Sequence, residues 1–271
     1  MLDSYASEQL NPHLWRITDS LGVCCYLVTG AERACLLDTC NGFGNIRSCA
    51  EALTNKPVFV ILTHGHLDHA GGAGLFPEVW MNPADLPVFR KHSDMGFRCR
   101  DLSISTGRTV CSRDLVPEFT GRLQPLTDRQ RFDLGGLTIE MIAVPGHTPG
   151  MMCVLLKEDR TILFGDACGV AVMLFDEFSS CVSAYRKSLL NLQKYEPRYD
   201  TVYRNHGTFV SPKILLENVI ACCDRILAGS DDHIPVEFHG MHLYACSAAD
   251  SHGRRLDGVE GNILYTAEKA R

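Results

Sequence analysis

Residues 63–69, with the sequence THGHLDH, bring together side chains that can bind a metal ion. His64, His66 and His69 lie beside Asp68 in this segment. Imidazole is the commonest metal ligand among side chains, and aspartate binds hard or borderline cations. The spacing therefore favours a metal site over acid–base catalysis alone. The remaining ligands must then come from other parts of the chain.

Three later segments share one pattern, in which an apolar run ends in a residue of ligand type. They are VPGHTPG with His147, LFGDACG with Asp166 and YRNHG with His206. With the four residues of 63–69 they make seven candidate ligands. Seven is too many for one tetrahedral ion and enough for two ions that share a carboxylate. The pattern therefore predicts a dinuclear centre.

The order of these ligands resembles that of the metallo-beta-lactamase superfamily, whose hydrolase branch has HxHxDH followed by later His, Asp and His ligands. The resemblance runs from the early strands through His206 and includes residues 83–131 and the tail after Gly229 only loosely. It implies two divalent ions, with zinc expected first and iron or manganese as alternatives. It implies one metal held by His64, His66 and His147, a second held by Asp68, His69 and His206, and Asp166 as the bridge.

Two further positions follow from the resemblance. Asp38, in LLDTCNG, matches an acidic residue that lies beneath the metal loop in the superfamily. Asp38 would accept the free N–H of a ligating imidazole and so hold that imidazole in one tautomer. The other interpretation is that Asp38 only forms a turn at the end of a strand. At Asn205 the family usually has glycine; because asparagine tolerates left-handed backbone, we expect the loop to be preserved.

Strands and helices alternate along the chain and would position these residues. Alternating or continuous apolar runs predict strands at 14–18, 23–30, 33–39, 57–63, 137–144, 151–156, 161–166 and 201–207. Helical spacing and capping residues predict helices at 42–54, from a Ser180 cap through Leu192, and at 211–229. The tail holds two predicted strands, at 236–245 and 262–268. The ligand-bearing segments should thus leave the ends of buried strands as loops.

The resemblance implies an α/β (α+β) fold, the four-layer αββα metallo-beta-lactamase sandwich, with the metals at one rim between the sheets. We expect a single domain over residues 1–271, with a lid or insert at 83–131 and a strand-rich tail at 230–271. The insert has an excess of arginine, and its simplest interpretation is a solvated flap. A further hypothesis is that Arg98 and Arg100 select an anionic substrate.

The composition is that of a folded globular protein, with 45% hydrophobic and 21% charged residues. A net charge of −6 argues against a dedicated nucleic-acid partner. No secretory signal or membrane span is recognisable in the sequence. The thirteen cysteines include no CxxC motif, and we expect them to be reduced core residues of a cytoplasmic protein. The strand-rich tail could pair across a homodimer.

The predicted function is hydrolysis, in which a metal-bridging hydroxide attacks a small-molecule carboxyl ester, thioester or lactone. Asp68 would also relay a proton to the leaving group. By the resemblance, true beta-lactamases usually lack the bridging Asp166, and glyoxalase II enzymes have a helical C-terminal region that this tail does not match. The alternatives are a phosphodiester hydrolase, a persulfide dioxygenase-type enzyme with a single iron, and a non-catalytic binding protein.

Overall fold

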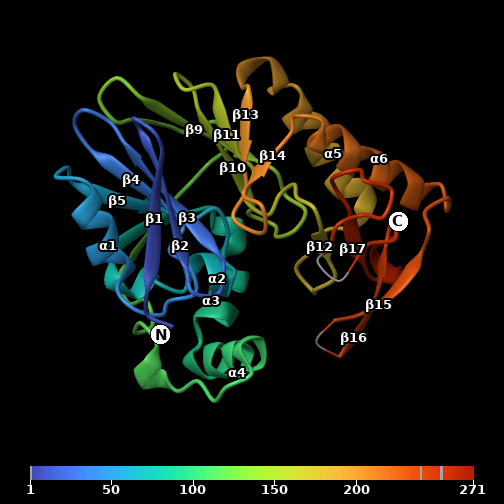
Figure 1. Ribbon diagram of the computed structural model, residues 1–271, viewed down its shortest axis with the longest axis horizontal. Coiled ribbons are helices and arrows are strands. Elements are labelled where there is room, and N and C mark those ends of the chain that lie inside the picture. The colour runs from blue at the N-terminus through green and yellow to red at the C-terminus, as the bar shows by residue number, and fades with distance from the viewer. Residues whose placement is uncertain (1, 239, 251–252) are drawn as a thin grey trace. The chain divides into compact units, whose positions relative to one another are not determined.

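The computed structural model describes residues 2–238, 240–250 and 253–271, and its fold is mixed α/β, as the sequence predicts (Figure 1). The described strands form three sheets, one more than the two layers of strands expected. Contacts divide the chain into two compact units, residues 1–139 with 205–207 and residues 140–204 with 208–271. The interpretation of the whole chain as one domain stays a prediction. Within the described residues, each helix is too short or too polar to cross a membrane.

The first unit is built on a seven-stranded sheet in the order β1-β2-β3-β4-β5-β6-β7. Its strands are β1 (Tyr5–Asn11), β2 (Leu14–Asp19), β3 (Cys24–Thr29), β4 (Ala34–Leu37), β5 (Val58–Ile61), β6 (Glu78–Met81) and β7 (Arg122–Pro125). The first four strands form an antiparallel meander, of which the sequence predicts β2, β3 and β4, and β4 to β7 run parallel. The sequence did not predict β1, because YASEQLN is a polar, largely exposed edge strand.

Helices of this unit connect the parallel strands. They are α1 (Ile46–Leu53), α2 (Leu67–Ala70), α3 (Leu86–Ser93) and α4 (Met95–Thr106), with short 3-10 helices η1 (Ala73–Leu75), η2 (Pro83–Asp85) and η3 (Ser112–Asp114). In α1 the Asn45 side chain caps the N-terminus by accepting the N–H of Ser48 at 2.9 Å. Ile46 and Ala50 then pack into a core with residues of the sheet. The predicted helix within 42–54 is confirmed, with a later start.

The arginine-rich segment 83–131 contains α3, α4 and the edge strand β7. Arg98, on α4, is only 2% exposed and donates to the carbonyls of Val116 at 2.8 Å and Gly71 at 2.9 Å. The hypothesis that Arg98 selects a substrate is therefore wrong, because its guanidinium is buried against backbone oxygens. Arg100 is exposed, and the interpretation of the segment as a lid stays a prediction.

The second unit contains most of a six-stranded sheet in the order β14-β13-β11-β10-β9-β8, and the chain passes from one unit to the other within β9. The strands are β8 (Arg131–Asp133), β9 (Thr138–Ala143), β10 (Met152–Leu156), β11 (Thr161–Leu163), β13 (Thr201–Tyr203) and β14 (Val210–Ser211). The strands predicted at 137–144, 151–156, 161–166 and 201–207 are confirmed as β9, β10, β11 and β13. The sequence did not predict β8, and it placed the start of a helix at β14.

Two long helices, α5 (Val182–Gln193) and α6 (Leu215–Leu227), pack side by side in the second unit (Figure 1), with the 3-10 helix η4 (Glu196–Arg198) after α5. The predicted apolar face of α5 is buried. Its N-cap is Cys181 rather than Ser180. The start predicted for α6 at Ser211 is wrong, because Ser211 pairs in β14 and the helix begins at Leu215.

Three strands of the tail form a third sheet together with β12, which comes from before α5. Its strands, in the order β12-β17-β16-β15, are β12 (Val172–Leu174), β17 (Ile263–Tyr265), β16 (Met241–Ala245) and β15 (Ile234–Phe238), and the chain ends in η5 (Ala267–Lys269). The strand predicted over 236–245 is a hairpin of β15 and β16, and its residue 239 lies outside the described residues. All thirteen cysteines are free and most are buried, in agreement with a role as core residues.

Candidate metal centre

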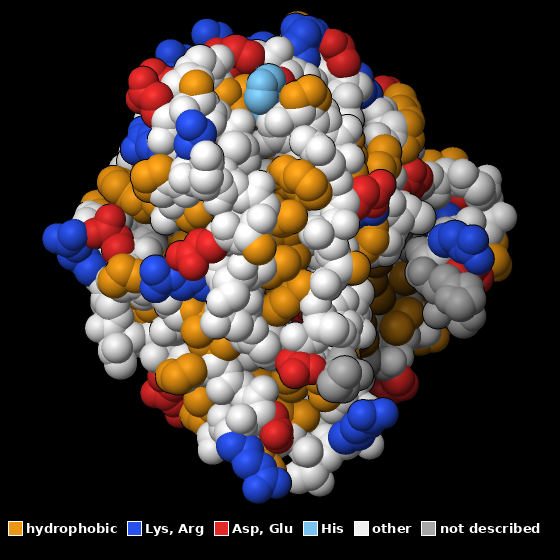
Figure 2. All heavy atoms as spheres, turned by 60° about the vertical axis from the view of Figure 1, so that its left-hand side comes forward, with side chains coloured by type: hydrophobic (Ala, Val, Ile, Leu, Met, Phe, Trp, Pro, Cys, Tyr) orange, Lys and Arg blue, Asp and Glu red, His pale blue; other side chains and the backbone are white. Residues whose placement is uncertain are grey.

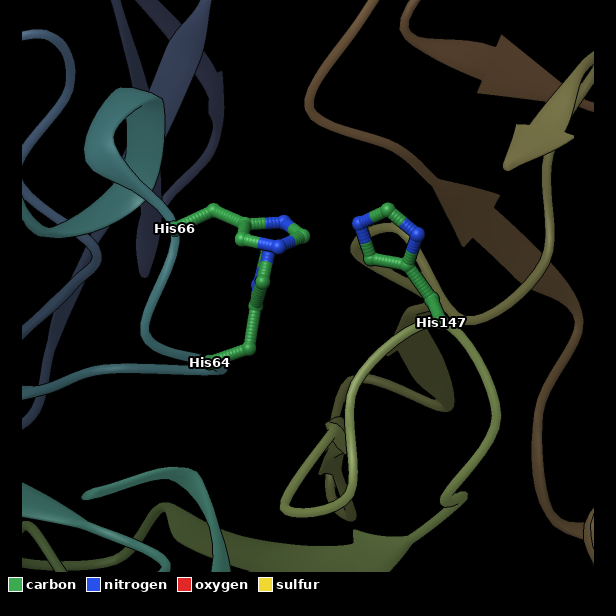
Figure 3. Close-up of side chains that lie close together, drawn as sticks. All are labelled: His64, His66 and His147. Atoms are coloured by element: carbon green, nitrogen blue, oxygen red, sulfur yellow. The ribbon is translucent and has the colours of Figure 1, made fainter. Parts of the chain in front are cut away.

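The ligand segment 63–69 starts as extended backbone after β5 and ends as helix. His66 is the N-cap of α2 and has extended backbone (φ −68°, ψ 152°), whereas Asp68 and His69 lie on the helix itself. The prediction of a loop is therefore correct only for the first part. The rings of His64 and His66 meet edge to face with centroids 4.8 Å apart, as Figure 3 shows. Asp68 and His69 thus leave the helix rather than the extended chain, and the His69 ring still lies close to His64, with centroids 4.1 Å apart.

Every second backbone N–H of this segment donates a hydrogen bond to a side chain from elsewhere in the first unit. The pairs are Thr63 N–H to Asp38 Oδ1 at 2.7 Å, Gly65 N–H to Asp85 Oδ2 at 2.7 Å, and Leu67 N–H to His92 Nδ1 at 3.2 Å. Asp85 is fully buried, and His92 caps the N-terminus of α2 from outside the helix. Sequence reasoning missed Asp85 and His92, because no local pattern reveals that 83–93 folds against the ligand segment.

Gly65 itself is required by this packing. A Cβ at this position would lie 2.7 Å from the backbone nitrogen of Phe89, on α3. The ligand segment and α3 can therefore approach each other this closely only with glycine at 65. Segment 83–131 thus supports the ligand residues directly.

The tautomer of His69 is set by Asp38. The two side chains are 0% and 1% exposed, and His69 Nδ1 lies 2.9 Å from Asp38 Oδ2. Because a carboxylate can only accept, Nδ1 carries the proton and the lone pair is on Nε2. This is the contact that the resemblance implies for Asp38, and it prepares His69 for binding a metal through Nε2.

His64 is oriented by the same carboxylate through the hydroxyl of Thr63. Thr63 Oγ1 donates to Asp38 Oδ2 at 2.9 Å, so it accepts from His64 Nδ1 at 3.0 Å. This arrangement leaves the lone pair of His64 on Nε2, as in His69. One buried carboxylate therefore sets the tautomers of two predicted ligands.

Three predicted ligand atoms of the first unit form a compact triangle. His69 Nε2 lies 3.1 Å from His206 Nε2, His206 Nε2 lies 3.3 Å from Asp68 Oδ2, and Asp68 Oδ2 lies 3.6 Å from His69 Nε2. Two ligands at zinc-bond lengths in a tetrahedron are separated by roughly 3.3 Å. The triangle therefore fits a single ion, which is the second metal position of the predicted set.

Asn205 holds the turn that carries His206 by hydrogen bonding. Its Nδ2 donates to Cys24 O at 2.7 Å and to Asp38 Oδ2 at 3.2 Å, and Cys24 N–H donates to Asn205 O at 2.9 Å. The expected left-handed backbone occurs at Gly207 (φ 69°) rather than at Asn205. The loop is preserved, but the amide side chain is the reason.

The second unit holds the other two predicted ligands, His147 after β9 and Asp166 after β11. His147 Nδ1 donates to the carbonyl of Met173 at 2.8 Å, which leaves the lone pair on Nε2. This Nε2 lies 3.7 Å from Asp166 Oδ2, a separation that two ligands of one ion can have. Figure 3 shows His147 on its loop. The neighbouring glycine is required, because a Cβ on Gly146 would lie 2.1 Å from the Tyr185 ring.

Known proteins share sequence with much of this chain. The sequence model of the metallo-beta-lactamase superfamily matches residues 19–203. A Bacillus subtilis protein named "Probable metallo-hydrolase YybB" is 32% identical over 57% of this chain and 60% of its own length. The "Atrochrysone carboxyl ACP thioesterase" of Aspergillus fumigatus is 30% identical over 52% of this chain and 38% of its own length. The matches span less than two thirds of these relatives.

A solved structure shows the same fold at lower sequence similarity. It is a metallo-beta-lactamase family protein from Thermus thermophilus, with a TM-score of 0.59, 21% identity and coverage of 82% of each chain. The family match covers more than half of the sequence, including six of the seven predicted ligands. The chain belongs to the metallo-beta-lactamase superfamily.

Proposed function

We propose that this protein is a dinuclear metal-dependent hydrolase that cleaves a small-molecule carboxyl ester, thioester or lactone. The observation that carries the proposal is that His64, His69 and His147 are held in the same tautomer. Each of these imidazoles uses Nδ1 to donate to an oxygen of the protein and keeps its Nε2 lone pair. Imidazoles prepared in this way are typical of metal ligands with an ordered outer shell.

In this proposal the seven predicted ligands serve one centre, with Asp166 as the shared carboxylate. Support comes from the order of the ligands along the chain, which is the order of the family. Two divalent ions, zinc first and iron or manganese as alternatives, would supply a water of lowered pKa and polarise the substrate carbonyl. Mixed imidazole and carboxylate ligands without thiolate suit all three metals.

The protein side chains contribute positioning and proton transfer. His64 and His69 are fully buried, whereas the side chains of Asp68 and His206 are 34% and 37% exposed. Asp68 Oδ2 can therefore reach both a metal ligand position and solvent. We propose that it carries a proton to the leaving oxygen or sulfur as the acyl bond breaks.

The net charge of −6 supports a small-molecule substrate over a nucleic acid. The one face drawn in Figure 2 carries basic and acidic side chains intermixed with apolar ones. A nucleic-acid site would gather Lys and Arg on one surface. A thioesterase among the relatives supports the thioester class in particular.

The test is a hydrolysis screen on protein whose metal content has been measured. Esters, thioesters, lactones and phosphodiesters would be compared at matched concentrations. We expect turnover of a carboxyl substrate with two divalent ions per chain. One iron per chain with oxygen consumption, or turnover of phosphodiesters alone, would reject the proposal.

A further inference from the structure

The first unit has a cavity of about 520 Å³ beside the start of β5. Aromatic rings of Phe59, Trp80 and Phe132 line it, and Arg33, Glu78 and Arg131 are among its polar residues. We call this the aromatic cavity. Its volume falls in the range of about 300–1,000 Å³ that small-molecule sites occupy, and its mixture of rings with a few polar groups is also typical of such sites.

The three rings form one connected wall. Phe132 lies 5.5 Å from Phe59 and 5.2 Å from Trp80 between ring centroids, with the Trp80 pair edge to face. Phe132 is 6% exposed, whereas Phe59 and Trp80 are half-buried. The partly exposed indole of Trp80 can therefore contact a further aromatic ring.

The charge at this cavity is positive. The guanidinium of Arg33 lies 5.1 Å from the centroid of the Phe59 ring, and its Nε donates to Asp133 O at 2.7 Å. Arg33 and Arg131 are both exposed. The negative charge of Glu78 is offset by Arg122, because Glu78 Oε2 accepts from Arg122 Nε and also from Gln124 Nε2, each at 2.8 Å.

We propose that the aromatic cavity binds a flat aromatic molecule that carries an anionic group such as a carboxylate or sulfonate. The ring would pack against Trp80 beside Phe59, and the anion would bind the guanidinium of Arg33, which lies over the Phe59 ring, with Arg131 as a second exposed guanidinium. This site is separate from the metal ligands. Phe59 is near the start of β5 and His64 follows its end, roughly 15 Å further along an extended chain.

The chain has two tryptophans, Trp15 and Trp80, so Trp15→Phe leaves Trp80 as the sole fluorescent indole. The anionic probe is 1-anilinonaphthalene-8-sulfonate, and the neutral probe is N-phenyl-1-naphthylamine, which lacks the sulfonate. We expect saturable energy transfer from Trp80 to the anionic dye. Calorimetry on the unaltered chain gives a second measurement that does not depend on the tryptophan replacement.

The decisive variant is Arg33→Gln with Arg131→Gln. We expect it to weaken binding of the anionic dye about tenfold or more and that of the neutral dye much less, because only the first loses charge-assisted contacts. Arg113→Gln, at another exposed arginine of the same unit, should change neither. Circular dichroism would check that each variant is folded.

Two results would overturn the proposal. They are equal affinity for the two dyes and unchanged affinity in the double variant. Metal content and hydrolysis should be unchanged in the double variant, so these outcomes do not depend on the proposed function.

Discussion

The carboxylate of Asp38 accepts the Nδ1 proton of His69 at 2.9 Å. Through the Thr63 hydroxyl, the same carboxylate oxygen also orients His64. Asp38 adopts the left-handed region with φ 68°, a conformation that aspartate and asparagine tolerate better than most residues. A single buried residue thus prepares one ligand for each of the two predicted metal positions.

Replacing Asp38 with Asn should weaken metal binding with little change to the backbone. Asparagine keeps the size and tolerates positive φ, but it removes the anionic acceptor of His69. Loss of such an outer-shell partner typically costs about 10–100-fold in metal affinity. Titration against a chromophoric chelator measures this loss, with the exposed Asp128→Asn as the matched control. Equal metal affinity in the two variants would contradict the role of Asp38.

Asp68→Ala should lower turnover more than substrate binding. Asp68 Oδ2 lies 3.3 Å from His206 Nε2, and we propose that it delivers the proton to the leaving group. General acid catalysis contributes about 10²–10⁴-fold, so kcat should fall by that order while KM changes far less. The comparison uses protein at matched metal content. An unchanged kcat at full metal content would rule out the proton transfer.

Arg98→Ala should destabilise the first unit, unlike Arg100→Ala. The Arg98 guanidinium donates to two backbone carbonyls, those of Gly71 and Val116, and truncation leaves both without this donor. We expect a loss of about 2–4 kcal/mol in the free energy of unfolding, from unsatisfied acceptors and the cavity together. The exposed Arg100 should contribute less than about 0.5 kcal/mol. Urea unfolding followed by circular dichroism compares the two, and similar losses would be inconsistent with this contrast.

Cys181 should be among the first thiols to be alkylated. The pKa of Cys181 is lowered because the Ser183 hydroxyl, 3.4 Å away, and the Ala184 N–H stabilise the thiolate. By contrast, burial raises the pKa of Cys49, another partly exposed cysteine, and lowers its thiolate fraction at any given pH. Peptide mapping after brief iodoacetamide treatment near neutral pH should find Cys181 modified ahead of Cys49. Ser183→Ala should slow the reaction, and faster labelling of Cys49 would refute the prediction.

Several elements show why part of the fold could not be read from the sequence. β1 is polar and mostly exposed, so it lacks the apolar residues by which β2 and β3 were recognised. The hairpin of β15 and β16 looked like one strand, because the pattern of side chains does not show where the chain reverses. Strand pairing depends on partners that are distant in sequence, whereas spacing reports only local preference.

The sequence by itself determined the identity of the candidate ligands and the strands that deliver them, because strand periodicity and ligand chemistry are local properties. Only the tertiary structure decided that Asp85 and His92 bind the backbone of the ligand segment and that Arg98 is buried beneath it. These contacts require residues 83–98 to fold back on residues 63–71. They exist only once the first unit has formed its core, where buried backbone groups must find hydrogen-bond partners.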